Sequence, residues 1–178
     1  METYIAFLRG INVGGHNIIK MKLLQEVLGT LKFESIITYK QSGNIIFNCK
    51  ETKIEVIQEK MKKAIKQEFD LEIPVLVLPK KEFLTIITEN PYDQQGDMMK
   101  MALYYILLFD QLNTEQIEKL KLVQQNNNWE IRKNVIYLNC PERYGNTKWN
   151  SNFFENKFKI VATARNYQTM LAITQILD

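Results

Sequence analysis

The sequence predicts an α+β protein in which a βαββαβ order of elements occurs twice. Short runs rich in β-branched and aromatic residues alternate with segments of helical periodicity, and a tight turn separates two of the runs in each half. The pattern then restarts near residue 101. This order is that of the split βαβ, or ferredoxin-like, motif. We therefore expect two ferredoxin-like subdomains in tandem plus a C-terminal helix, with antiparallel sheets and helices packed on one face of each.

The composition is typical of a folded chain, with 178 residues of which 46% are hydrophobic and 24% are charged. The net charge of +3 does not indicate a strong field for nucleic acid. The longest apolar run, residues 101–109, is far shorter than the about 20 residues that a membrane helix needs. Cys49 and Cys140 are far apart and favour buried thiols in a reducing compartment. We expect a cytoplasmic protein with no membrane association.

Residues 1–79 form the first predicted subdomain. Tyr4–Leu8 is apolar on both faces, which is typical of a buried strand. The spacing of Thr52 and Glu55 predicts a capping box at the start of the second helix. Pro74 removes a hydrogen-bond donor and therefore favours an edge position for the last strand. The predicted elements are a strand at 4–8, a helix at 21–31, strands at 33–39 and 45–49 around a turn, a helix at 54–69 and a strand at 73–78.

Residues 80–100 are expected to connect the subdomains through a short helix, stopped at Asn90-Pro91, and a polar loop from residue 92. The second subdomain, residues 101–178, repeats the order, and we expect the whole chain to form one compact unit. Its predicted elements are a strand at 101–109, a helix capped by Asn113, strands at 129–132 and 135–139, a helix at 151–158, a strand at 160–164 and a terminal helix at 167–177.

A glycine-rich segment, Arg9–Asn17, lies between the first strand and the first helix, where amides and the helix dipole favour an anion. Its glycine spacing resembles the opening of a phosphate-binding Walker loop, but His16 and Asn17 stand where that motif requires Lys and Ser or Thr. No dinucleotide fingerprint can be found. His16 has no partner at a catalytic or metal-binding spacing, so the segment predicts anion binding through amides, Arg9 and Lys20.

Two further polar clusters lie at predicted element ends, at residues 41–44 and 163–169. Asn166 is placed to cap the terminal helix through its side-chain oxygen. Arg165 carries a fork-shaped cation that suits a carboxylate or phosphate partner.

These motifs together resemble a bacterial family of cytosolic proteins, the domain-of-unknown-function family 1697. The resemblance rests on RGINVGG at residues 9–15, SGN at 42–44, Asn90-Pro91 and T-x-R-N-x-x-T at 163–169. It implies an α+β fold of ferredoxin-like units and brings no established activity. Tyr167 stands where the family often has tryptophan, and His16 matches no fixed family residue. The motif positions are Arg9, Gly10, Asn12, Gly14, Gly15, Ser42, Gly43, Asn44, Thr163, Arg165, Asn166 and Thr169.

The leading functional hypothesis is binding of a small anionic or phosphorylated ligand, and the sequence predicts no particular reaction, cofactor or metal. A nucleic-acid-associated module that uses the sheet face or the lysines of residues 60–66 is an alternative. A structural protein that pairs as a homodimer through strand edges is another. The leading hypothesis requires the three polar clusters to meet in space. Its candidate ligand-binding residues are Arg9, Asn12, Gly14, Gly15, Lys20, Ser42, Asn44, Arg165, Asn166 and Thr169.

Overall fold

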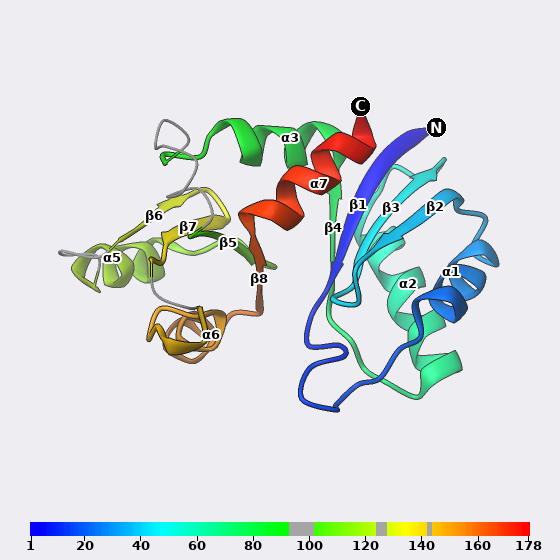
Figure 1. The fold of residues 1–178 in the computed structure, drawn as a ribbon, viewed down its shortest axis with the longest axis horizontal. Helices are drawn as coiled ribbons and strands as arrows, with labels where there is room; N and C mark the ends of the chain where they lie inside the picture. Colours follow the sequence, from blue (N-terminus) through cyan, green and yellow to red (C-terminus); the bar gives the residue numbers. More distant parts are fainter. Residues whose placement is uncertain (93–101, 124–127, 142–143) are drawn as a thin grey trace. The chain divides into compact units, whose positions relative to one another are not determined.

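The fold is described from a computed structural model, which covers residues 1–92, 102–123, 128–141 and 144–178 (Figure 1). The chain divides into two compact units, Met1–Leu84 and Thr85–Asp178. Each unit contains a four-stranded antiparallel sheet, with strand orders β2-β3-β1-β4 and β6-β7-β5-β8. These are equivalent orders, so the predicted pair of ferredoxin-like sheets is confirmed.

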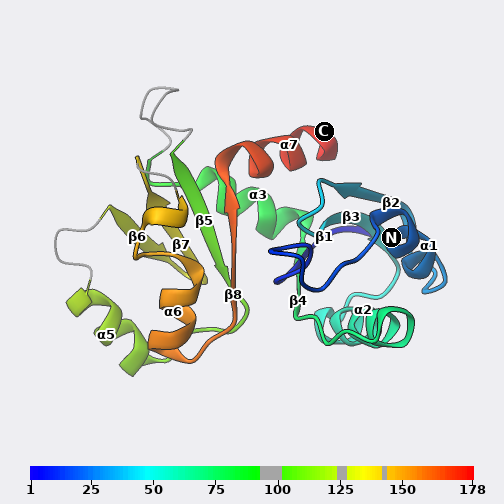
Figure 2. The ribbon, with the colours of Figure 1, turned by 60° about the horizontal axis from the view of Figure 1, so that its bottom comes forward.

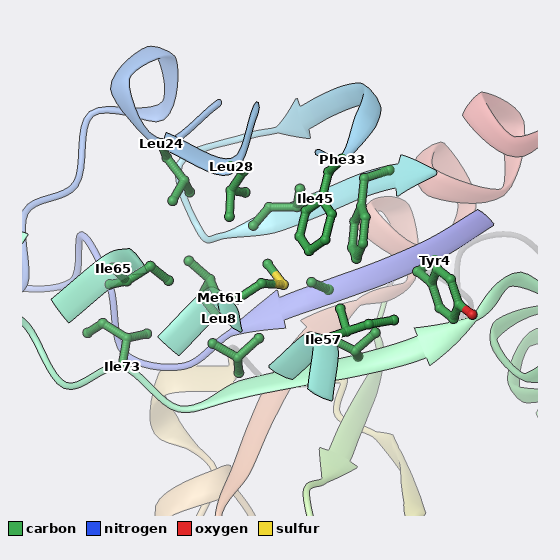
Figure 3. Packing of buried hydrophobic residues seen from close by; sticks show 14 of the residues in the cluster. Tyr4, Leu8, Leu24, Leu28, Phe33, Ile45, Ile57, Met61, Ile65 and Ile73 are labelled. Carbon is green, nitrogen blue, oxygen red and sulfur yellow. The ribbon is translucent and has the colours of Figure 1, made fainter. Parts of the chain in front are cut away.

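Unit 1 buries one face of its sheet under two helices. Alternate residues of the first strand, which is one of the two central strands, enter this core because successive side chains of a strand point to opposite faces; these are Tyr4, Ala6 and Leu8. Leu24 and Met61 approach them from the two helices (Figure 3). The elements of unit 1 are β1 (Glu2–Leu8), α1 (Met21–Gly29), β2 (Glu34–Tyr39), β3 (Asn44–Cys49), α2 (Ile54–Phe69), β4 (Val75–Pro79) and the start of α3 (Lys80–Thr88).

Of two further predictions about unit 1, one is confirmed and the other is wrong. The last strand, β4, lies at a sheet edge as Pro74 led us to expect. The predicted capping box of α2 is wrong, because the N-cap is Lys53 and it makes no side-chain cap hydrogen bond. The carboxylate of Glu51 instead accepts hydrogen bonds from the backbone N–H groups of Thr52 and Lys53, at 3.0 and 3.1 Å.

Unit 2 has the same arrangement, with α5 and α6 covering one face of its sheet (Figure 2). Leu120, Phe154 and Phe158 of these helices pack against alternate residues of the sheet, including Ile106 and Ile136. The elements of unit 2 are the end of α3, β5 (Leu103–Leu108), α5 (Thr114–Val123), β6 (Trp129–Arg132), β7 (Val135–Asn139), a short 3-10 helix (Tyr144–Asn146), α6 (Ser151–Phe158), β8 (Ala162–Asn166) and α7 (Tyr167–Leu177).

The cap of α5 is confirmed, since Asn113 and Gln116 each accept a hydrogen bond from the other's backbone N–H. The last strand begins two residues later than predicted. The chain leaves α6 through Lys159 in the left-handed conformation, and the carboxylate of Glu155 holds the N–H of Ala162 at 2.9 Å, where the strand starts. The predicted connecting loop falls, apart from residue 92, outside the described residues.

Cys49 and Cys140 are both buried free thiols, as expected. None of the helices in the described ranges is long and apolar enough to cross a membrane.

Candidate functional site

The glycine loop, residues 9–20, connects β1 to α1 and continues beyond the end of β1 (Figure 1). Its tip is a tight turn in which the backbone N–H of His16 donates to the oxygen of Val13 at 3.0 Å. Gly14 and Gly15 occupy the two central positions with φ values of 58° and 79°. Two successive positive φ angles are what a type I′ turn requires, and glycine adopts them without steric penalty.

Asn12 holds the base of the glycine loop. Its side-chain oxygen accepts from the N–H of Ile19 at 2.9 Å, and its side-chain amide donates to the Ile19 oxygen at 3.0 Å. The same amide donates to the main-chain oxygen of Gln41 at 2.8 Å. These bonds close the loop on itself and join it to the turn between β2 and β3. Asn12 therefore stabilises the conformation of the loop.

The loop backbone is held in an unusual conformation. Five of the eight residues 10–17 have positive φ, and two of them, Asn12 and Asn17, are not glycine. The side chain of Asn17 donates to the oxygen of Gly10 at 2.8 Å, and its own backbone oxygen accepts from the Asn12 N–H at 3.2 Å. Asparagine tolerates this conformation better than most residues because its short amide bonds locally. The loop is consequently fixed by its own side chains.

The turn between β2 and β3 also needs its motif residues for structural reasons. Gly43 has a φ of 74°, and a Cβ there would lie 2.6 Å from the Cβ of Leu8. The side-chain amide of Asn44 donates to the oxygen of Tyr39 and to the hydroxyl oxygen of Ser42, at 2.8 and 3.0 Å. Together with the bond from Asn12 to Gln41, these contacts bring the first two predicted polar clusters together within unit 1.

The N-terminus of α1 differs from that of α2. Lys20 is the N-cap of α1 and makes no side-chain cap hydrogen bond, and the first turn contains no acidic residue. The first turn of α2 contains Glu55, and Glu51 precedes it. Hydrogen bonds from the Lys53 and Thr52 amides lower the pKa of Glu51, as expected for a carboxylate in a field of N–H dipoles. The positive end of the α1 dipole therefore has no nearby carboxylate in its own first turn.

Sequence reasoning missed what the glycine loop presents to solvent. Its asparagine side chains are directed to the loop's own backbone, whereas Val13 and Ile18 are 65% and 60% exposed. His16 and Lys20 are exposed as well. The signal available in the sequence was a pair of β-branched residues flanking a Gly-Gly turn.

The third predicted cluster lies in unit 2. Arg165 on β8 is only 6% exposed, and its Nη1 donates to the hydroxyl of Thr163 and to the oxygen of Ala164, both at 2.8 Å. Burial lowers the pKa of the Arg165 guanidinium to about 10, because the charged form is poorly solvated there, while Tyr144 acts in the opposite direction. Arg165 is still charged at neutral pH.

Asn166 plays the predicted capping role. The side-chain oxygen of Asn166 accepts from the backbone N–H of Thr169 at 2.9 Å and so caps α7. Because Arg165 belongs to unit 2 and the glycine loop to unit 1, their predicted common pocket stays a prediction.

A row of polar side chains crosses the sheet of unit 2 beside Arg165. Tyr105 pairs with Arg165 on one side and with Tyr137 on the other, and all three share one face of the sheet. Asn90, which the sequence marked only as a helix stop, is buried and donates to the Tyr105 hydroxyl at 2.8 Å. The Tyr137 hydroxyl donates to the oxygen of Ile86 at 3.0 Å. These bonds fix the end of α3 to unit 2.

Within the part of the chain that the structure describes, no group of three or more His, Cys, Asp or Glu side chains could hold a metal ion.

The fold and its loops define a class of α+β protein with two tandem ferredoxin-like sheets and a polar loop cluster at one end of the first. The chain belongs to the family described as "Protein of unknown function (DUF1697)", whose model matches residues 1–137. It is also similar to a solved structure, the conserved bacterial protein SP0830 from Streptococcus pneumoniae, with a TM-score of 0.72 and 18% sequence identity over 99% of both chains. At this identity the likeness concerns the fold alone. A comparison with curated proteins finds no match.

Proposed function

We propose that this protein binds a small anionic or phosphorylated ligand at the glycine loop and the adjoining N-terminus of α1. The observation that supports this most is the uncapped start of α1, which has Lys20 at the N-cap and no acidic residue in the first turn. The first backbone N–H groups of a helix have no intrahelical acceptor, and they carry the positive end of its dipole. An oxyanion is the natural partner of such a terminus.

The glycine loop adds donors and charge to this terminus. The amides of Gly14 and Gly15 make no hydrogen bond to any residue in the described ranges. Arg9 and Lys20 begin and end the loop, and no Asp or Glu occurs from residue 3 to residue 25. In the proposal these amides and cations bind the ligand, whereas Asn12 positions the loop.

The other candidate residues have more indirect roles in the proposal. Ser42 and Asn44 hold the turn to which the loop is bonded. Arg165 is retained as a candidate cation, tested separately below, and Asn166 and Thr169 organise the start of α7 beside it.

The first experiment replaces the proposed ligand by a built-in carboxylate. Lys20→Asp places an N-cap acceptor at the start of α1, which normally stabilises a helix by about 0.5–2 kcal/mol. We expect the variant to be more stable than the parent without ligand and to lose its response to ligand. Lys53→Asp is the matched control, because it makes the same change at the N-cap of α2, which also lacks a side-chain cap hydrogen bond but has Glu55 in its first turn.

The measurement is a thermal-shift screen against nucleotides, sugar phosphates, inorganic phosphate and carboxylates. A ligand at a hundred times its dissociation constant stabilises the native state by about 2.7 kcal/mol. We expect the parent and Lys53→Asp to respond and Lys20→Asp and Arg9→Ala not to respond. A response that persists in Lys20→Asp contradicts the proposed site. A loss of affinity in Arg165→Ala, measured on folded protein by calorimetry, would add Arg165 to the site.

Each of the two alternative functions, nucleic-acid binding and assembly, has a separate test. Binding of single-stranded RNA that falls steeply with salt would favour the nucleic-acid module. A dimer at micromolar concentration whose dissociation follows changes at a strand edge would favour assembly.

A further inference from the structure

We infer that the anion bound at the glycine loop is carried by a peptide segment of another protein, in which a phosphate or carboxylate lies next to apolar side chains. This inference rests on the proposed function and specifies the partner of the same site. It is carried by three features of the loop: two exposed apolar side chains, a fixed backbone and a uniform positive charge.

The exposed apolar side chains are the first feature. Val13 is 65% exposed and Ile18 is 60% exposed, and they flank the Gly14-Gly15 turn on either side. A free phosphate or a small carboxylate bound by amides and cations would leave both side chains in water. Covering them requires a ligand with apolar groups of its own, and that burial is favourable.

The fixed backbone is the second feature. Asn12 and Asn17 direct their amides to the loop's own backbone, and the Val13–His16 turn is closed by a hydrogen bond. Asn12 and Asn17 keep positive φ angles of 53° and 49°, which carry a conformational cost for residues other than glycine. A rigid loop loses little entropy on binding, which suits recognition of a partner with a defined shape. A lipid surface has no defined shape to match, and for this reason we favour a peptide.

The uniform charge is the third feature. Lys20 and Lys22 are exposed at the start of α1, and Arg9 lies at the other end of the loop. Lys40 belongs to the turn that Asn12 bonds through Gln41. The nearest acidic residues along the chain are at positions 2 and 26. A partner segment with negative charge complements this surface and would be attracted to it over a distance.

The test compares two series of short fluorescent peptides by anisotropy. One series contains a phosphoserine or a glutamate pair next to leucine or phenylalanine at several spacings, and the other has serine in place of each apolar residue. We expect only the first series to bind tightly. In the double variant Val13→Thr, Ile18→Thr, which keeps the β-branched shape of both residues, we expect affinity for the first series to fall about tenfold or more.

Ile37→Thr is the matched control, because Ile37 is an exposed isoleucine on β2, at 42%, outside the loop. It should leave peptide affinity unchanged. The affinity for inorganic phosphate should be the same in the parent, the control and the double variant, because no apolar contact is involved.

Several results would overturn the inference. These are equal binding of the two peptide series, unchanged peptide affinity in the double variant, or no binding by any peptide while phosphate still binds. The proposed function survives each of them, whereas loss of the phosphate response from the parent contradicts the proposed function itself. Loop-dependent binding to phosphatidylserine vesicles but not to peptides would assign the surface to lipid. Loop-dependent self-association in ultracentrifugation would assign it to a second copy of the chain.

Discussion

The side-chain amide of Asn12 donates a hydrogen bond to the main-chain oxygen of Gln41, 2.8 Å away and 29 positions further along the chain. This bond joins the glycine loop to the turn between β2 and β3. It ties two polar motifs that are separated in sequence to each other within unit 1. The shape of the proposed anion site therefore depends on residues that need not touch the ligand.

Replacing Asn12 should destabilise unit 1 and loosen the loop. Asn12→Ala removes three hydrogen bonds, each worth about 0.5–1.5 kcal/mol, and leaves alanine at a φ of 53°. We expect a loss of about 2–4 kcal/mol in urea unfolding. Asn12→Gly should lose about 1 kcal/mol less, because glycine accepts the positive φ. Equal losses in the two variants would show that backbone strain contributes nothing at this position.

Two glycines of the same region should respond differently to alanine. A Cβ added at Gly15 would meet no atom within 4 Å. Gly15→Ala should therefore reduce the free energy of unfolding by only about 1–2 kcal/mol, the cost of a non-glycine residue in the left-handed conformation. Gly43→Ala adds a Cβ 2.6 Å from that of Leu8, and should lose about 2–5 kcal/mol in all. Urea unfolding of both variants measures the difference. A Gly43→Ala protein as stable as Gly15→Ala would contradict the described packing of the turn.

The buried pair Asn90 and Tyr105 should be energetically coupled in unit 2. Tyr105→Phe removes the hydroxyl that accepts from the Asn90 amide, and a buried donor left without its acceptor costs about 1–3 kcal/mol. We expect a double-mutant cycle with Asn90→Ala to give a coupling of about 1 kcal/mol or more. Additive effects of the two substitutions would mean that the hydrogen bond does not contribute to stability.

Glu51 should contribute to the pH dependence of unfolding. Its folded-state pKa lies below the ordinary value of 4.5, chiefly because the Lys53 N–H donates to it. A carboxyl group with a lowered folded pKa stabilises the fold fully above its unfolded-state pKa, and this contribution is lost as the pH falls through the folded pKa. Acidification through and below pH 4.5 should therefore destabilise the parent more than Glu51→Gln. Urea unfolding curves of both proteins at several pH values measure this difference. An equal loss of unfolding free energy in the parent and in Glu51→Gln on acidification would contradict the prediction.

Much of the fold could be predicted because each element carries a strong local pattern. Val135–Asn139 and Ser151–Phe158 agree residue for residue with expectation, since turns and a cap bound them tightly. The hydrogen bonding before α2 could not be predicted, because the Thr52 N–H, which a capping box assigns to Glu55, donates to Glu51 instead, and only the chain path decides between the two carboxylates.

The candidate site was predictable in part. Residues with special backbone needs, such as Gly14 and Gly43, stand out in the sequence, and the structure gives them positive φ. The inward direction of Asn12 and the exposure of Val13 depend on how the loop closes on Ile19, which no local pattern records. The burial of Arg165 likewise depends on long-range packing.

Binding of an anion at the glycine loop and the start of α1 can be observed residue by residue in an NMR titration of the backbone amides with inorganic phosphate. We predict saturable shift changes at Gly14, Gly15 and the first residues of α1, Met21 and Lys22, with no comparable change at the start of α2. The changes should disappear in Lys20→Asp and persist in Lys53→Asp. Equal changes at both helix starts, or none at either, would contradict anion binding at this site.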